Sequence, residues 1–323
     1  MSRGRKKELS LGNRLMLSLY VFLVSMLILF AAAVWGIGYM AADKVLSPVS
    51  GEETITNTLE WLGMTEEEAE KQLAEYSVKK LSVGTGKKAI PAWYLENAYG
   101  QNRLVVMVHD TGMDHRQMIA YTELFWDMGY SMVLYDQRGS GINENKGITA
   151  GILEQGDLDA VISTVRETID PEIIGVWGTG SGANTALLYG EHDKELSFLI
   201  LDSVGRSFEE VVNTEIQEGR LPFPESIERF CTDWYFRLWG GISSVRAGDL
   251  YEAAVSCKVP VLMVHSSMDK RVSMEEAERI FSAFPEECEA EFFRVLYSAA
   301  GEAYIDEPFS YQTAVADFLD KIL

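Results

Sequence analysis

The chain has 323 residues, of which 47% are hydrophobic, so it can bury a sizeable core and is not a fibrous or intrinsically disordered protein. Its net charge is −21, although residues 1–14 hold five basic residues and one acid, so the remainder is more acidic still. Such an acidic body repels phosphate backbones, which argues against nucleic-acid binding. Three widely spaced cysteines give neither a disulfide framework nor a paired metal motif.

The first predicted element is a transmembrane helix over residues 15–42, which carry no charged side chain. About 20 apolar residues suffice to span a bilayer. The basic tail over residues 1–14 predicts a cytoplasmic N-terminus and an extracytoplasmic domain on the cell membrane. A cleaved signal peptide is the alternative, because residues 31–33 and 40–42 resemble small-residue cleavage sites. The apolar run exceeds the usual signal-peptide length, which favours a retained anchor.

Residues 43–76 are predicted to form a helical connector, in which Thr65 and Glu68 fit a capping box. From residue 77 to 323, apolar runs alternate with helix-period stretches, which predicts a mostly parallel sheet with helices on both faces. The segment from about 204 to 256 breaks this alternation and is rich in aromatic residues. We interpret it as a helical cap over the carboxyl edge of the sheet, where ligands bind in such folds.

Five short motifs follow in order along residues 77–323. They are Val108–Asp110, Asp136–Gly141, Trp177–Gly182, His265–Val272 and Ala299–Tyr304. Their order and spacing resemble the α/β-hydrolase superfamily, nearest to bacterial membrane-anchored hydrolases of the serine-aminopeptidase or lysophospholipase-like type. The resemblance implies an α/β fold with a mostly parallel, eight-stranded-type sheet, a cap, and a Ser-Asp-His triad in that order along the chain.

The resemblance places Gly180, Asp269 and Ala300 at the nucleophile, acid and base positions of the triad. Glycine has no hydroxyl group and alanine cannot accept a proton, so the triad is degenerate. By the same resemblance, the backbone N–H groups of Thr111 and Ser181 occupy the oxyanion-hole positions.

Three residues are candidate substitute groups. Ser181 follows the nucleophile position, but a step of about 100° around the helix is expected to turn its hydroxyl away from the attack site. His115 opens a helix near the expected pocket mouth and is a candidate base. Asp110 stands near the oxyanion site, where a negative charge opposes a developing oxyanion unless the side chain only forms a local turn.

No metal or cofactor motif is present in the sequence. The motifs predict a membrane-anchored pseudoenzyme that binds a lipid-like or peptide-like ligand or a protein partner, and no nucleic acid. The alternative is an active serine hydrolase of the esterase, lipase or peptidase type, which uses a non-standard constellation such as Ser181 with a displaced base.

Overall fold

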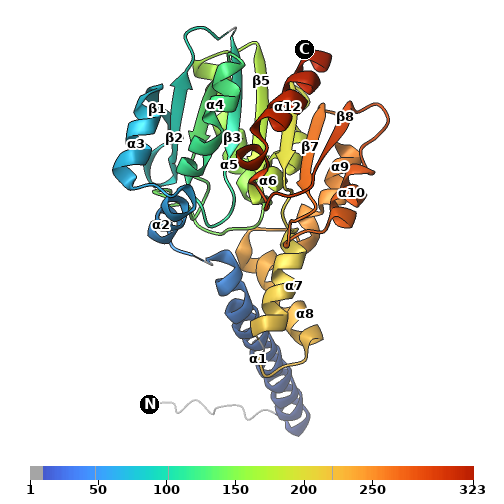
Figure 1. Cartoon of the computed structure of the whole chain (residues 1–323). Coiled ribbons are helices and arrows are strands. Elements are labelled where there is room, and N and C mark those ends of the chain that lie inside the picture. Colours follow the sequence, from blue (N-terminus) through green and yellow to red (C-terminus); the bar gives the residue numbers. More distant parts are fainter. Residues whose placement is uncertain (1–9, 48, 101, 220) are drawn as a thin grey trace.

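The computed structural model describes residues 10–47, 49–100, 102–219 and 221–323. Most of the predicted basic tail lies outside the described residues. The described chain forms an eight-stranded sheet with helices on both faces, and a long N-terminal helix that extends away from the sheet (Figure 1). This architecture confirms the predicted fold class.

The strands lie in the order β1-β2-β4-β3-β5-β6-β7-β8. The pairs β1–β2 and β2–β4 are antiparallel, and every other neighbouring pair is parallel. Strands β3 to β7 are almost entirely buried because helices cover both faces. Their bounds are β1 Ser77–Val83, β2 Ile90–Glu96, β3 Arg103–Val108, β4 Ser131–Tyr135, β5 Ile173–Thr179, β6 Phe198–Asp202, β7 Val261–Ser266 and β8 Ala290–Val295.

Two apolar clusters fill the two faces of the sheet. Helices α5, α6, α9 and α10 contribute to one cluster, and α3, α4 and α12 contribute to the other. A short helix, α11, precedes α12 (Figure 1). The bounds are α3 Glu66–Ala74, α4 Ile119–Asp127, α5 Glu154–Thr168, α6 Ser181–Gly190, α9 Leu250–Ser256, α10 Met274–Phe281, α11 Ala303–Asp306 and α12 Pro308–Ile322.

Helix α1 (Leu11–Leu46) is, among the described residues, the one helix long and apolar enough to cross a membrane. Its large side chains up to Phe30 are exposed, whereas five residues between Val34 and Val45 are buried. Helix α2 (Gly51–Leu62) follows, and α3 begins with the predicted capping box of Thr65 and Glu68. The first two thirds of α1 therefore present apolar surface outward, while its last third belongs to the folded domain.

The segment between β6 and β7 holds α7 (Phe208–Gly219), α8 (Glu225–Tyr235), a π-helical turn over Phe236–Gly240 and a 3-10 turn over Val245–Gly248 before α9. A third apolar cluster joins this segment to α1 and includes Ala42, Phe208 and Phe236. Figure 1 shows α7 and α8 beside α1, below the sheet. The predicted cap therefore packs on the end of α1 as well as lying beside the sheet edge.

Candidate active site

The turn between β5 and α6 is centred on Gly180, whose backbone has φ 58° and ψ −123°. L-residues rarely adopt this conformation, and glycine does so at little cost. Gly182 allows α6 to approach β3, because a Cβ at this position would lie 2.2 Å from the carbonyl oxygen of Val108. The strained turn that presents a nucleophile in hydrolases is therefore kept here without a side chain.

The carboxylate of Asp110 fills the space over Gly180. A Cβ built on Gly180 would lie 2.2 Å from Oδ1 of Asp110. This oxygen accepts hydrogen bonds from the backbone N–H groups of Thr111 and Ser181, both at 2.8 Å. Two N–H donors converging on one anionic oxygen have the donor arrangement of an oxyanion hole. Asp110 thus supplies an internal anion to these donors.

Arg271 completes the environment of this carboxylate, because its guanidinium pairs with Oδ2 of Asp110. The negative charge of Asp110 raises the pKa of Arg271. Both oxygens of Asp110 are therefore bound, one by backbone N–H groups and the other by a cation, and such charge-assisted hydrogen bonds are strong.

The hydroxyl of Ser181 contacts Thr111, contrary to the expectation that it turns away from the site. Its Oγ accepts from the N–H and from the hydroxyl of Thr111, both at 2.7 Å. Side chains in the first turn of a helix lean toward its N-terminus, which directs Ser181 to the elbow. In the part of the chain that the structure describes, no imidazole or carboxylate accepts a hydrogen bond from this hydroxyl.

Asp269 lies on the turn after β7, and its Oδ1 accepts from the N–H groups of Arg271 and Val272 at 2.7 and 3.1 Å. Its Oδ2 is buried and has no hydrogen-bond partner among the residues described. The loop that carries Ala300 lies beside the elbow, because a Cβ on Gly301 would lie 2.7 Å from Oγ1 of Thr179. Alanine offers no group that could pair with the orphaned carboxylate oxygen.

His115 lies away from this site, which corrects its prediction as a substitute base. Its Nδ1 is 2.7 Å from Oδ1 of Asp136, and its ring stacks on Trp93 with centroids 3.5 Å apart. Burial alone would raise the pKa of Asp136, but the hydrogen bond and charge of His115 lower it. The 3-10 turn over His115–Met118 directs this side chain into the core.

The remaining histidines are also engaged elsewhere. Nε2 of His109 accepts from the N–H of Gln137 at 3.0 Å, and Nε2 of His265 lies 3.1 Å from the carbonyl oxygen of Val272. Burial lowers the pKa of both rings, so both favour the neutral form. His192 is exposed beyond the end of α6. No described histidine therefore stands where it could activate Ser181.

Asp114, His115 and Asp136 form the group whose ligand atoms are close enough to hold a metal ion, all within 4.8 Å of one another. Each carboxylate is already satisfied, since Asp114 pairs with Arg116 and Asp136 pairs with His115. A buried cluster with such internal partners stabilises the fold, and we assign it no metal.

A cavity of about 230 Å³ opens over the elbow, between α7, the end of α1 and Arg271. It is smaller than the roughly 300–1,000 Å³ typical of sites for drug-sized ligands, so it suits a small ligand or one part of a larger one. Its polar residues include Lys44, which pairs with Glu215 at 3.2 Å. The lining comprises apolar Val45, Ile148, Ala150, Phe208 and Val211, with Lys44, Asp110, Thr111, Ser181, Gly205, Arg206, Glu215 and Arg271.

Comparisons with known proteins agree with the fold described above. An esterase of Pyrococcus furiosus, Pf2001, matches with a TM-score of 0.61 at 19% identity, over 78% of this chain and 95% of that chain. An esterase of Exiguobacterium antarcticum matches with a TM-score of 0.51 at 16% identity, over 75% and 99% of the two chains. An uncharacterized protein of Bacillus subtilis (strain 168), YqkD, is 30% identical over 228 residues, which are 68% of this chain and 71% of that protein. This chain belongs to the same family as YqkD, and its likeness to the two esterase structures shows that it has the α/β-hydrolase fold. No protein-family model matches it.

A buried polar network supports the elbow of this α/β-hydrolase-fold domain. Asp202, at the end of β6, accepts hydrogen bonds from the hydroxyls of Ser203 and Tyr311 at 2.9 and 3.0 Å. Tyr311 accepts in turn from the indole N–H of Trp177 at 2.9 Å. Ser203 accepts from the N–H of Gly301 at 2.8 Å, which fixes the loop beside the elbow.

Asp202 is expected to make stability depend on pH. Burial raises its pKa from 3.8 to about 6, although the hydrogen bonds from Ser203 and Tyr311 oppose the shift. Below about pH 4 this carboxyl is protonated in both the folded and the unfolded state, so its burial costs least. Between about pH 4 and pH 6 it loses its proton first in the unfolded state, so the free energy of unfolding falls by about 3 kcal/mol in total.

Asp202→Asn should remove this dependence. Its free energy of unfolding should therefore rise by about 1 kcal/mol relative to that of the wild type when the pH is raised from about 5 to about 7. Urea unfolding of the full chain in detergent at several pH values measures the difference. Asp317→Asn, on the exposed side of α12, is the matched control and should leave the profile unchanged. Parallel profiles for the wild type and Asp202→Asn would contradict the prediction.

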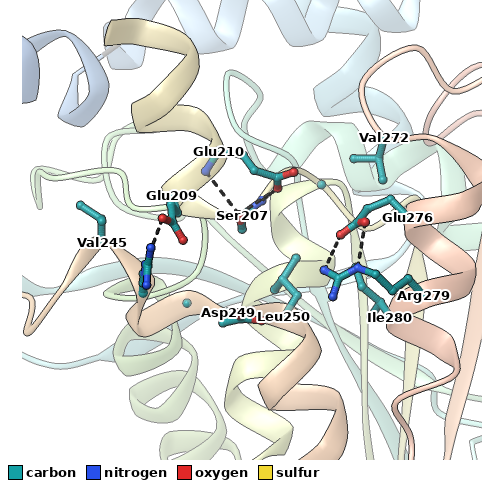
Figure 2. Close-up of a pocket in the computed structure, with 13 residues that line it drawn as sticks. Ser207, Glu209, Glu210, Val245, Asp249, Leu250, Val272, Glu276, Arg279 and Ile280 are labelled. Atoms are coloured by element: carbon teal, nitrogen blue, oxygen red, sulfur yellow. Dashed lines mark hydrogen bonds and ion pairs between the residues drawn. The ribbon is translucent and has the colours of Figure 1, made fainter. Parts of the chain in front are cut away.

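A second cavity, of about 180 Å³, lies between α7, α9 and α10 (Figure 2). Two ion pairs line it: Arg246 binds Glu209 at 3.0 Å, and Arg279 binds Glu276 at 2.6 and 2.9 Å (Figure 2). It is lined by neither the elbow nor Asp110. We therefore place the candidate site of this hydrolase-fold domain at the cavity over Gly180.

Proposed function

We propose that this chain is a membrane-anchored α/β-hydrolase-fold protein that has lost hydrolysis and binds a small amphipathic ligand in the cavity over its elbow. The observation that carries the proposal is the carboxylate of Asp110, which fills the space of a nucleophile side chain at Gly180. The same carboxylate binds the N–H groups of Thr111 and Ser181.

Three features of the site oppose catalysis. A serine hydroxyl needs an adjacent base, and Ser181 contacts only Thr111 through its side chain in the described part of the chain. A developing oxyanion needs the two N–H donors that Asp110 engages, and its negative charge would be repelled by this carboxylate. The triad acid, Asp269, has no imidazole to orient.

The charges around the cavity favour a ligand with a negative group. Lys44 pairs with Glu215, and Arg271 pairs with Asp110. Arg206 makes no ion pair with any described residue, and its guanidinium donates to the hydroxyl of Thr214 at 3.2 Å. Apolar side chains from α1 and α7 complete the lining. A short acyl chain with a carboxylate or phosphate head matches this combination of groups.

Photocrosslinking of membranes that contain the full chain tests this ligand class, with a diazirine-bearing medium-chain fatty acid as the probe. Crosslinks are expected on α7. Arg206→Gln should reduce labelling about tenfold, because a hydrogen bond to a charged group contributes about 1.5–3 kcal/mol. Val211→Trp should abolish it by filling the cavity. The control Val255→Trp, at an exposed position of α9, should label as the wild type does. Equal labelling of all variants would refute this ligand site.

The anchoring part of the proposal rests on the apolar α1 and on the basic residues before it. Protease added to intact cells should degrade the sheet domain and leave a small membrane-bound fragment. The same protease added to inverted vesicles should leave the domain intact. A full-length protein in the soluble cytosolic fraction would contradict the anchor.

A further inference from the structure

Helix α8 and the π-helical turn that follows it carry a row of large apolar side chains on the surface. Four of these residues are spaced by three, four and four positions, which places them on one face of α8 and of the turn that continues it. Each is 42–56% exposed, so none is covered by the rest of the described chain. The stripe consists of Ile227, Phe230, Trp234 and Leu238, with Phe223 in the bend before α8 and Trp239 beside Leu238.

The other side of α8 is packed tightly against α1. A Cβ on Gly38 would lie 2.5 Å from the carbonyl oxygen of Cys231 and 2.5 Å from Cβ of Tyr235, so the two backbones meet at this glycine. The ring of Tyr39 lies edge-on to Tyr235, with centroids 6.1 Å apart, and stacks on Trp35 at 5.5 Å. This packing fixes α8 beside the last third of α1 (Figure 1).

The height of α8 relative to a bilayer follows from the length of α1. A hydrocarbon core about 30 Å thick takes about 20 helical residues, so a span that starts at Leu15 ends near Val34. Trp35 and Tyr39 then lie at the membrane–water interface, which these residue types favour. Because α8 packs against α1 from Val34 onward, its apolar stripe lies at this same interface.

We propose that the apolar stripe of α8 is a second membrane contact, inserted into the leaflet from which α1 emerges. Amphipathic helices with Trp, Phe and Leu on one face bury this face in the region between headgroups and acyl chains. Ring contacts from Trp35 through Tyr39 and Tyr235 to Trp239 connect the exposed apolar surface of α1 to the stripe, which favours lipid as the partner of both. The cavity over Gly180, lined by Lys44 and Val45 of α1, then opens close to the membrane surface.

This inference rests on the proposed membrane span of α1. Labels at four positions test the span of α1 and the contact of α8 separately. Single cysteines at Leu27 on α1, Phe230 and Leu238 on the stripe, and Tyr99 on the exposed turn before β3, at the edge of the sheet opposite the elbow, are coupled to the fluorophore NBD. The native cysteines are buried, and the wild-type chain provides the labelling blank. The full-length variants are reconstituted into phosphatidylcholine vesicles with and without nitroxide-labelled acyl chains.

Strong quenching by the nitroxide lipid is expected at Leu27, Phe230 and Leu238, at least about twofold, and none at Tyr99. Quenching at Leu27 alone would overturn the second contact and leave the anchor intact. An unquenched label at Leu27 would overturn both proposals. A blue-shifted but unquenched label at Phe230 and Leu238 would mean that protein, for instance a second copy, covers the stripe, which also overturns the lipid contact.

Discussion

Gly180→Ala is expected to lower the free energy of unfolding by about 2–5 kcal/mol. One part is backbone strain, because φ is 58° at this position. The other is steric, because the new Cβ would lie 2.2 Å from the carboxylate of Asp110. Denaturant unfolding of the full chain in detergent measures the loss.

A double-mutant cycle separates the two contributions. In the Asp110→Gly background the clash is absent, so Gly180→Ala should cost only about 1–3 kcal/mol of strain. Gly156→Ala is the control, because this exposed glycine of α5 has open space around it and should gain about 0.5–1 kcal/mol. Additive effects of Gly180→Ala and Asp110→Gly would show that the carboxylate does not fill the elbow.

Hydrolysis is expected to return only when three positions change together. Gly180→Ser restores a nucleophile, and Ala300→His restores a base that Oδ2 of Asp269 could orient. This double variant should stay at background, because Asp110 still engages both N–H donors. Adding Asp110→Gly should raise p-nitrophenyl ester hydrolysis by about 10²-fold or more, since one lost oxyanion donor alone costs about 10²–10³.

The control for this experiment is the same triple background with Gly180→Ala in place of Gly180→Ser. It should remain inactive, which assigns any gained activity to the hydroxyl at this position. A double variant that is as active as the triple variant would show that Asp110 does not block the oxyanion site, and would contradict the account of this carboxylate.

The central and carboxyl-terminal strands were predictable from sequence because each is a short apolar run. Residues 154–168 form one of the helix-period stretches of the sequence, and α5 has these bounds. The edge strands β1 and β2 were not identified individually. Both are partly exposed; β1 includes Lys79 and Lys80, and β2 has Pro91 as its second residue, which weakens its strand signal. Antiparallel strands at a sheet edge keep one face in solvent, which weakens the apolar signal.

Only part of the candidate site could likewise be predicted from sequence. The missing hydroxyl at Gly180 and the missing imidazole at Ala300 can be predicted from sequence, because a motif fixes each position. The pairing of Asp110 with Arg271 cannot be predicted in this way, because the two residues are 161 positions apart and meet only through the fold. Asp202 was missed as well, since it follows an apolar strand and matches no motif. The packing of α8 on α1 likewise depends on tertiary contacts around Gly38.

The most direct test of the central claim is labelling of the wild-type full chain with a serine-directed fluorophosphonate, read out by intact mass alongside p-nitrophenyl ester turnover. The account predicts no adduct and turnover at background, because the elbow residue is Gly180 and Asp110 occupies the oxyanion donors. A stoichiometric adduct on Ser181, with turnover that Ser181→Ala abolishes, would contradict it and establish an active serine hydrolase.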